Sequence, residues 1–92
     1  MAVGLILEFK GATLDQYDKV LELMDLGGET PPGGLFHWVT PTDDGFRATD
    51  VWVDRATFDK FAEEKIGPLS AEAGITSPPE ITEFPVHNHL PA

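Results

Sequence analysis

The sequence has no cysteine among its 92 residues. This absence excludes disulfide bonds, thiolate metal sites and a cysteine nucleophile. Basic residues are few, because six lysines and arginines stand against sixteen acidic residues, and the formal net charge is -10. An acidic surface repels the phosphates of nucleic acid and the headgroups of an anionic membrane. We therefore expect neither nucleic acid nor a membrane as a partner.

Long apolar runs are also lacking, since none approaches the ~20 residues that cross a bilayer. The N-terminus has no basic region of the kind that begins a signal peptide, so a cytoplasmic location is expected. The hydrophobic share of 41% is typical of a globular chain. We expect one domain over residues 1–92, and a domain of this size is marginally stable as a monomer.

Capping and turn signals divide the chain into strands and helices. Thr13, followed three residues later by Gln16, matches a capping box at a helix start. The expected elements are a strand at 2–10, a helix from Thr13 to Gly27-Gly28, strands at 35–40 and 46–53, a helix from Asp54 to Gly67-Pro68, a short helical turn at 68–74, and a strand at 80–89 that Pro85 interrupts. The Gly- and Pro-rich loop at 27–34 is a candidate lid.

The order β-α-β-β-α-β predicts an α+β fold of the ferredoxin-like type, with two helices on one face of a four-stranded antiparallel sheet. Apolar residues occupy both faces of the central strands. Phe36 and Trp38 point to one side of their strand, and Leu35 and Val39 point to the other. An exposed sheet face of this kind predicts a homodimer in which two sheets pack face to face.

One segment carries a resemblance to a known family. Asp50-Val51-Trp52-Val53-Asp54-Arg55-Ala56-Thr57-Phe58 is similar to the "v-x-W-x-s-x-e-a-F" segment that joins the third strand to the second helix in antibiotic-biosynthesis-monooxygenase-like domains. The resemblance implies a dimeric α/β barrel with a cavity between helices and sheet, lined by Trp52. The superfamily includes cofactor-independent oxygenases of polycyclic phenols, polyketide cyclases, haem-handling enzymes and stress proteins, so the resemblance implies no single reaction.

The strand periodicity puts Asp50 on the cavity side together with Trp52. A buried carboxylate needs a partner, and His37 is the candidate. A two-residue Asp44-Gly45 turn would make His37 a diagonal neighbour of Asp50 on the same face. A three-residue loop at 43–45 would shift the register by one and turn His37 toward the dimer interface. The sequence leaves both registers open.

A shared face would allow base catalysis. His37 would act as the general base, and Asp50 would orient its tautomer and raise its basicity. Tyr17 and Trp52 would flank an aromatic substrate. Proton abstraction from a phenol or activated carbon would give an anion that reacts with oxygen or closes a ring. This predicts a cofactor-independent monooxygenase or cyclase acting on an aromatic or polyketide-like molecule.

Each of these residues also has a structural interpretation. The His37–Asp50 pair could simply satisfy two buried polar groups, and Tyr17 could be a core tyrosine. His87 is a candidate second cavity histidine, and Trp38 is a candidate substrate contact or a packing residue. The alternative function is a non-catalytic ligand-binding or stress-type dimer.

The histidines suggest two candidate cofactor sites. His87 and His89 alternate on one side of the last predicted strand, but no third metal ligand can be assigned. Haem could use His37 or His87 as an axial ligand, but the acidic chain offers no clear clamp for its propionates. We expect no metal and no cofactor.

Overall fold

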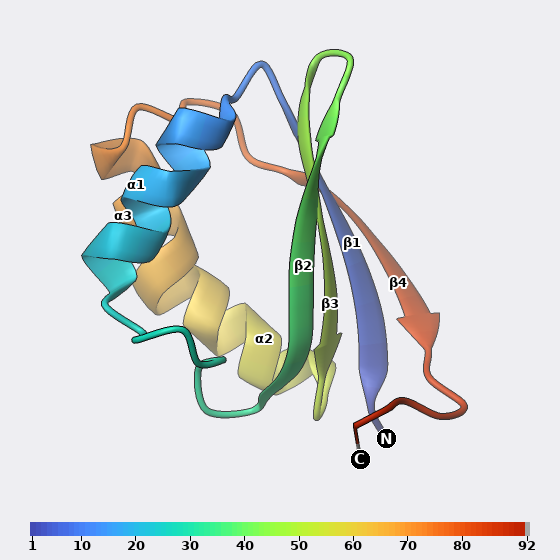
Figure 1. Ribbon diagram of the computed structural model, residues 1–92. Coiled ribbons are helices and arrows are strands. Elements are labelled where there is room, and N and C mark those ends of the chain that lie inside the picture. The colour runs from blue at the N-terminus through green and yellow to red at the C-terminus, as the bar shows by residue number, and fades with distance from the viewer. Residues whose placement is uncertain (92) are drawn as a thin grey trace.

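The computed structural model describes residues 1–91, and it consists of a four-stranded antiparallel sheet with helices on one face (Figure 1). The elements are β1 (Val3–Lys10), α1 (Leu14–Met24), β2 (Gly34–Thr42), β3 (Gly45–Trp52), α2 (Arg55–Phe61), η1 (Ala62–Ile66), α3 (Gly67–Glu72) and β4 (Glu80–Pro85). The strands lie in the order β2-β3-β1-β4. This is the ferredoxin-like α+β fold that the sequence predicts. Within residues 1–91 no helix is long and apolar enough to cross a membrane.

Helix α1 begins as predicted but ends earlier. The Thr13 Oγ1 accepts a hydrogen bond from the backbone N–H of Gln16 at 3.1 Å, and the Gln16 Oε1 accepts one from the backbone N–H of Thr13 at 2.9 Å. The predicted end at Gly27-Gly28 is wrong, because Asp25 already adopts the left-handed conformation with φ 53°. Aspartate tolerates this conformation better than most residues. The segment after Asp25 is therefore free to run as a loop.

The second helical region does not end at Gly67-Pro68, contrary to the sequence-based prediction. It continues without a break from α2 through the π-helical turn η1 into α3. The backbone N–H of Gly67 bonds to the carbonyl of Ala62, five residues earlier. In a regular α-helix the ring of Pro68 would clash with the carbonyl four residues before it. The wider π turn directly before Pro68 relieves this clash, so the helix survives the proline.

The β2–β3 hairpin uses a turn that neither predicted register contains. The turn is Asp43-Asp44, and it puts His37 directly opposite Asp50. Of the two alternatives that the sequence left open, the structure has the shared face, but His37 lies directly opposite Asp50 and not diagonal to it. Gly45 begins β3 rather than completing the turn, and its φ is not positive. A side chain at Gly45 would overlap the carbonyl of Phe9, so glycine is needed here for the close approach of β1.

The core is a single layer between sheet and helices. Leu5 of β1 and Phe58 of α2 are the largest side chains with no solvent exposure. Their neighbours in this layer are Leu7, Phe9, Ala12, Val20, Phe46, Ala48, Trp52 and Ile75. The layer therefore joins β1, β3, α1 and α2 through apolar contacts.

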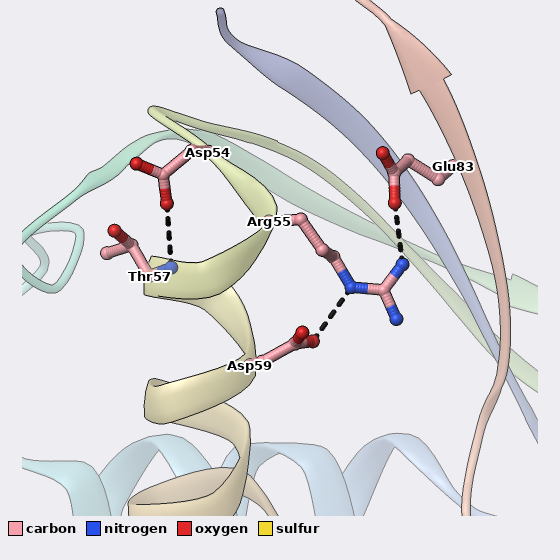
Figure 2. A network of polar contacts seen from close by, with 5 residues as sticks. All are labelled: Asp54, Arg55, Thr57, Asp59 and Glu83. Atoms are coloured by element: carbon pink, nitrogen blue, oxygen red, sulfur yellow. Dashed lines mark hydrogen bonds and ion pairs between the residues drawn. The ribbon is translucent and has the colours of Figure 1, made fainter.

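Arg55 ties the start of α2 to the outer strand β4 (Figure 2). Its Nε lies 2.7 Å from the Oδ1 of Asp59, and its Nη1 lies 2.7 Å from the Oε1 of Glu83. Asp54 caps the same helix, because its Oδ1 accepts a hydrogen bond from the backbone N–H of Thr57 at 2.7 Å. The helix therefore starts at a defined place immediately after β3, and β3 carries the residues of the site described below.

The face of the sheet turned away from the helices carries a group of apolar side chains, beside the Glu8–Arg47 ion pair and several threonines. We call this apolar group the far-face patch. Its members are Ile6, Phe36, Trp38, Val51 and Phe84. Strand β4 ends at Pro85 and not at His89 as predicted, but it is an edge strand as the proline indicates. All six residues of β4 are exposed. The outer face of the sheet and its β4 edge thus remain uncovered in the monomer.

Replacing Leu5 by alanine tests the core. Leu5 is fully buried, so Leu5→Ala should lower the free energy of unfolding by about 2–5 kcal/mol through lost burial and the cavity left behind. Urea unfolding followed by tryptophan fluorescence measures this change. The matched control is Leu90→Ala, because Leu90 is 78% exposed and its loss should change stability by less than about 0.5 kcal/mol. Equal effects of the two substitutions would contradict this description of the core.

Candidate functional site

A cavity of about 220 Å³ lies between the helices and the inner face of the sheet. Its polar wall carries His37 from β2, Asp50 from β3 and Tyr17 from α1. Most of the remaining lining is apolar, and it includes Trp52 and Phe61. The cavity is smaller than the range of ~300–1,000 Å³ that is usual for ligand sites. It is nevertheless a defined cavity with three polar side chains on one wall.

Four side chains form a continuous chain of hydrogen bonds at this wall. The Tyr17 hydroxyl lies 2.5 Å from the Nε2 of His37, and the Nδ1 of His37 lies 2.6 Å from the Oδ1 of Asp50. The indole N–H of Trp52 donates to the Oδ2 of Asp50 at 3.1 Å. Ionised aspartate only accepts hydrogen bonds, so His37 donates from Nδ1. In neutral His37 the Nε2 then accepts the hydrogen bond that Tyr17 donates.

The hydrogen bonds compensate the burial of Asp50. Its side chain is 8% exposed, against 33% for the side chain of His37. A carboxylate removed from water is costly unless its oxygens have partners. Here one oxygen accepts from His37 and the other from Trp52. The sequence-based requirement for a partner of Asp50 is met by the predicted residue, and Trp52 provides a second partner that was not predicted.

Strand alternation and helix packing position these groups. Phe46, Ala48, Asp50 and Trp52 alternate along β3 and all point to the helix side. Tyr17 projects from α1, and its ring centroid lies 5.9 Å from that of His37 and 5.4 Å from that of Phe46. The two ring contacts hold the Tyr17 hydroxyl against His37.

The local environment keeps Tyr17 protonated. Burial raises the pKa of the Tyr17 hydroxyl above its usual value, and the negative charges of Asp50 and Asp18 raise it further. All three causes act against the phenolate. At neutral pH Tyr17 therefore remains a hydroxyl that donates a hydrogen bond.

Two of the predicted substrate contacts do not lie in the cavity. Trp38 belongs to the far-face patch and is 50% exposed, because the neighbour of an inward-pointing His37 must point outward. His87 is exposed and lies beyond the end of β4, so the strand alternation on which its prediction rested does not apply. His89 contacts the carbonyl of Pro91 at 3.0 Å through its Nδ1. No group of three or more His, Cys, Asp or Glu side chains among residues 1–91 is arranged to hold a metal ion.

The structure adds lining residues that the sequence analysis did not single out. Glu29 and Pro31 of the loop after α1 border the cavity, which agrees with the predicted proximity of this loop. Ser70 is buried in α3 and lines both this cavity and a neighbouring one of about 470 Å³. The predicted helix end at Gly67-Pro68 hid this position. In a continuous helix Ser70 lies four residues after Ile66 and therefore on the same buried face. This spacing is the sequence signal that could have identified it.

No protein-family model matches the sequence, and no curated protein matches it. Solved structures do share its fold. SnoaB, a cofactor-independent oxygenase from Streptomyces nogalater, has 19% identity and a TM-score of 0.66, and the match covers 99% of this chain and 98% of SnoaB.

Two further solved structures extend the comparison. A Chloroflexus aurantiacus protein, provisionally named an antibiotic biosynthesis monooxygenase, has 23% identity and a TM-score of 0.63, with 97% of each chain covered. The monooxygenase from the gene ActVA-Orf6 of Streptomyces coelicolor, solved with the ligand nanaomycin D, has 19% identity and a TM-score of 0.57, with 99% and 92% covered. The chain therefore has the ferredoxin-like fold of the antibiotic-biosynthesis monooxygenases.

The ionisation of Tyr17 can be measured directly because it is the only tyrosine in the chain. Its ultraviolet titration midpoint should lie above the ordinary value of about 10, since burial and the Asp50 charge both oppose the phenolate. Between the Tyr17 pKa of the unfolded chain and the higher pKa of the folded chain, the unfolded chain binds fewer protons. The free energy of unfolding should therefore fall as pH rises from the lower to the higher of these two values.

The protein in concentrated urea serves as the reference for this titration, and Asp50→Asn should bring the folded midpoint back toward it. A folded midpoint equal to that of the unfolded chain would contradict the buried, hydrogen-bonded position of Tyr17.

Proposed function

We propose that this protein is a cofactor-independent monooxygenase that acts on a neutral phenolic substrate, of aromatic or polyketide-like type, with His37 as its base. The observation that carries the proposal is the Tyr17–His37–Asp50 chain, which opens into an apolar cavity beside Trp52. The fold shared with SnoaB and with the ActVA-Orf6 monooxygenase supports this choice over other chemistry.

The size of the cavity limits the substrate. A cavity of roughly 150 Å³ accommodates benzene, so about 220 Å³ leaves room for a substituted phenol or a small two-ring compound. A larger ring system would have to extend past the loop at Glu29 and Pro31.

The charge of the cavity limits the substrate as well. Glu29 and Asp50 are acidic, and no lysine or arginine occurs among the lining residues that the structure describes. These two acids would repel a carboxylate or phosphate on the ligand. A neutral phenol matches both the apolar walls and the polar chain.

The proposed reaction begins with removal of a proton from the substrate. His37 receives this proton, and Asp50 stabilises the imidazolium that forms. The resulting phenolate makes a ring carbon electron-rich, and dioxygen adds there to give a hydroperoxide after protonation. Loss of water from the hydroperoxide leaves a carbonyl group. One oxygen atom of the consumed dioxygen enters the product, and the other leaves as water.

A non-catalytic ligand-binding protein is the second candidate. The observation that favours it is that both ring nitrogens of His37 already have partners within the protein. A purely structural role would also require hydrogen bonds in which every polar atom has a partner within the protein. Turnover separates the two candidates.

Replacing His37 by glutamine tests the base. With a panel of one- and two-ring phenols and polyketide-like phenols, the wild-type protein should consume dioxygen at an oxygen electrode. His37→Gln should lower the rate about 10²–10⁴-fold, which is the usual contribution of a positioned base. Circular dichroism checks that the variant folds.

The matched control is His87→Gln, because His87 lies outside the cavity and its loss should leave oxygen consumption unchanged. Phenol binding without oxygen consumption by the wild-type protein would favour the binding function. Undiminished oxygen consumption by His37→Gln would exclude His37 as the base.

We further propose that the protein forms a homodimer through the far-face patch. Phe36, Trp38 and Phe84 are 42%, 50% and 48% exposed, and the strand registers put them on the same face of the sheet. A second copy presents the same apolar face, so a two-fold arrangement would cover both patches at once. Such burial would also stabilise a domain whose own core is small.

A charge placed in the far-face patch tests the dimer. The wild-type protein should sediment at about twice the chain mass of 10.0 kDa, and Trp38→Glu should sediment as a monomer because a carboxylate cannot be buried there. Leu14→Glu is the control, since Leu14 is similarly exposed at 40% but lies on α1. A monomeric wild-type protein, or a Trp38→Glu variant that stays dimeric, would rule out this interface.

A further inference from the structure

The hydrogen bonds of His37 restrict how a substrate can reach it. Its Nδ1 is held by Asp50 at 2.6 Å, and its Nε2 is held by Tyr17 at 2.5 Å. A neutral imidazole has one acceptor nitrogen, and Tyr17 occupies it. A substrate hydroxyl could therefore contact Nε2 only if Tyr17 moved away.

Movement of Tyr17 is opposed by its packing. The ring stacks on His37 with an interplanar angle of 20° and meets Phe46 edge-on at 64°. Tyr17 lies in the first half of α1, and the capping box of Thr13 and Gln16 stabilises that end of the helix. Tyr17 lines the cavity, and its hydroxyl oxygen keeps a lone pair that can accept a second hydrogen bond.

We propose that Tyr17 is the group that exchanges a proton with the substrate and that His37 acts through it, an inference that rests on the function proposed above. The substrate hydroxyl donates to the Tyr17 oxygen. As its O–H bond breaks, a new O–H bond forms on Tyr17, and the original Tyr17 proton moves to the Nε2 of His37. The products are a substrate phenolate, a neutral Tyr17 and an imidazolium paired with Asp50. No electron is transferred in this step.

The surrounding charges favour this relay over a free tyrosine anion. Asp50 faces His37 from β3, Asp18 acts on Tyr17 from α1, and Glu29 lines the cavity from the loop. These acids stabilise a positive imidazolium and destabilise a negative charge on Tyr17. Proton transfer through Tyr17 leaves the charge on the substrate and on His37, so Tyr17 itself stays neutral.

Trp52 is a positioning residue, because it orients Asp50 and takes no part in the proton transfer itself. Its indole N–H holds the Oδ2 of Asp50 at 3.1 Å, which leaves Oδ1 directed at His37. The indole ring is itself fixed by Phe58 and Phe61, whose centroids lie 5.5 and 5.3 Å away. The core thus orients Asp50, Asp50 orients His37, and His37 orients the hydroxyl of Tyr17.

A nitrophenol is a suitable probe because its phenolate absorbs visible light and no oxygen chemistry is required. The absorbance of the bound probe across a pH series gives its pKa in the site. In the wild-type protein this pKa should fall by at least about one unit, a tenfold change, because the relay gives the bound phenolate a hydrogen bond from Tyr17 and a nearby positive charge on His37. Tyr17→Phe and His37→Gln should each abolish the fall, while His87→Gln should preserve it.

A second variant distinguishes proton transfer from packing. Because Tyr17 is the only tyrosine, growth on fluorotyrosine places the label at this position alone. After transfer the Tyr17 hydroxyl donates to the substrate phenolate, and a more acidic fluorinated hydroxyl donates more strongly. The pKa of the bound nitrophenol should therefore fall further, although the ring packing is kept.

The outcomes separate the relay from the proposed function. If Tyr17→Phe keeps the lowered probe pKa and His37→Gln loses it, the substrate contacts His37 directly and the relay is wrong. A wild-type protein that does not bind the probe, or does not lower its pKa, also overturns the relay, as does fluorotyrosine without effect. If the relay appears with the probe but no phenol supports oxygen consumption, the monooxygenase proposal alone fails.

Discussion

The short contact between His37 and Asp50 is the interaction on which the rest of the site depends, and it exists because the two residues are directly opposite in the β2–β3 hairpin. Cross-strand neighbours at this separation can share a hydrogen bond with no adjustment of the sheet. A shift by one residue would point His37 away from Asp50 and leave a buried carboxylate without its main partner. The register thus decides whether Asp50 has its histidine partner or is left as an uncompensated charge in the cavity.

The same register couples the two faces of the sheet. Because side chains alternate along β2, turning His37 inward turns Trp38 outward. The cavity therefore gains its imidazole, and the far-face patch gains its largest side chain. Gly45 makes this arrangement possible, since β1 passes too close to β3 at that point for any side chain. One backbone constraint at the end of the hairpin consequently shapes both the proposed active site and the proposed dimer interface.

The comparison with solved structures supports the fold more strongly than the chemistry. Identities of 19–23% accompany nearly complete coverage of the chains compared, so the arrangement of strands and helices is common to all of them. Function resides in the residues placed on such a scaffold. In this chain the proposed function rests on Tyr17, His37, Asp50 and Trp52 and on the hydrogen bonds between them.

The inward position of Trp52 was implied by the family resemblance, and strand alternation then put Asp50 on the same side. The sequence by itself determined the order of elements and the capping box at Thr13, and it offered the pairing of His37 with Asp50 as one of two alternatives. Each of these follows from local periodicity or from a short-range hydrogen bond. The turn at Asp43-Asp44 and the helix that continues through Pro68 required the tertiary structure, because the close approach of β1 and the π turn override the local signals of Gly45 and Gly67. The link between Tyr17 and His37 also required it, since no sequence pattern reveals that a side chain of α1 ends 2.5 Å from one on β2. Contacts between distant segments depend on how whole elements pack, and only the folded chain determines that packing.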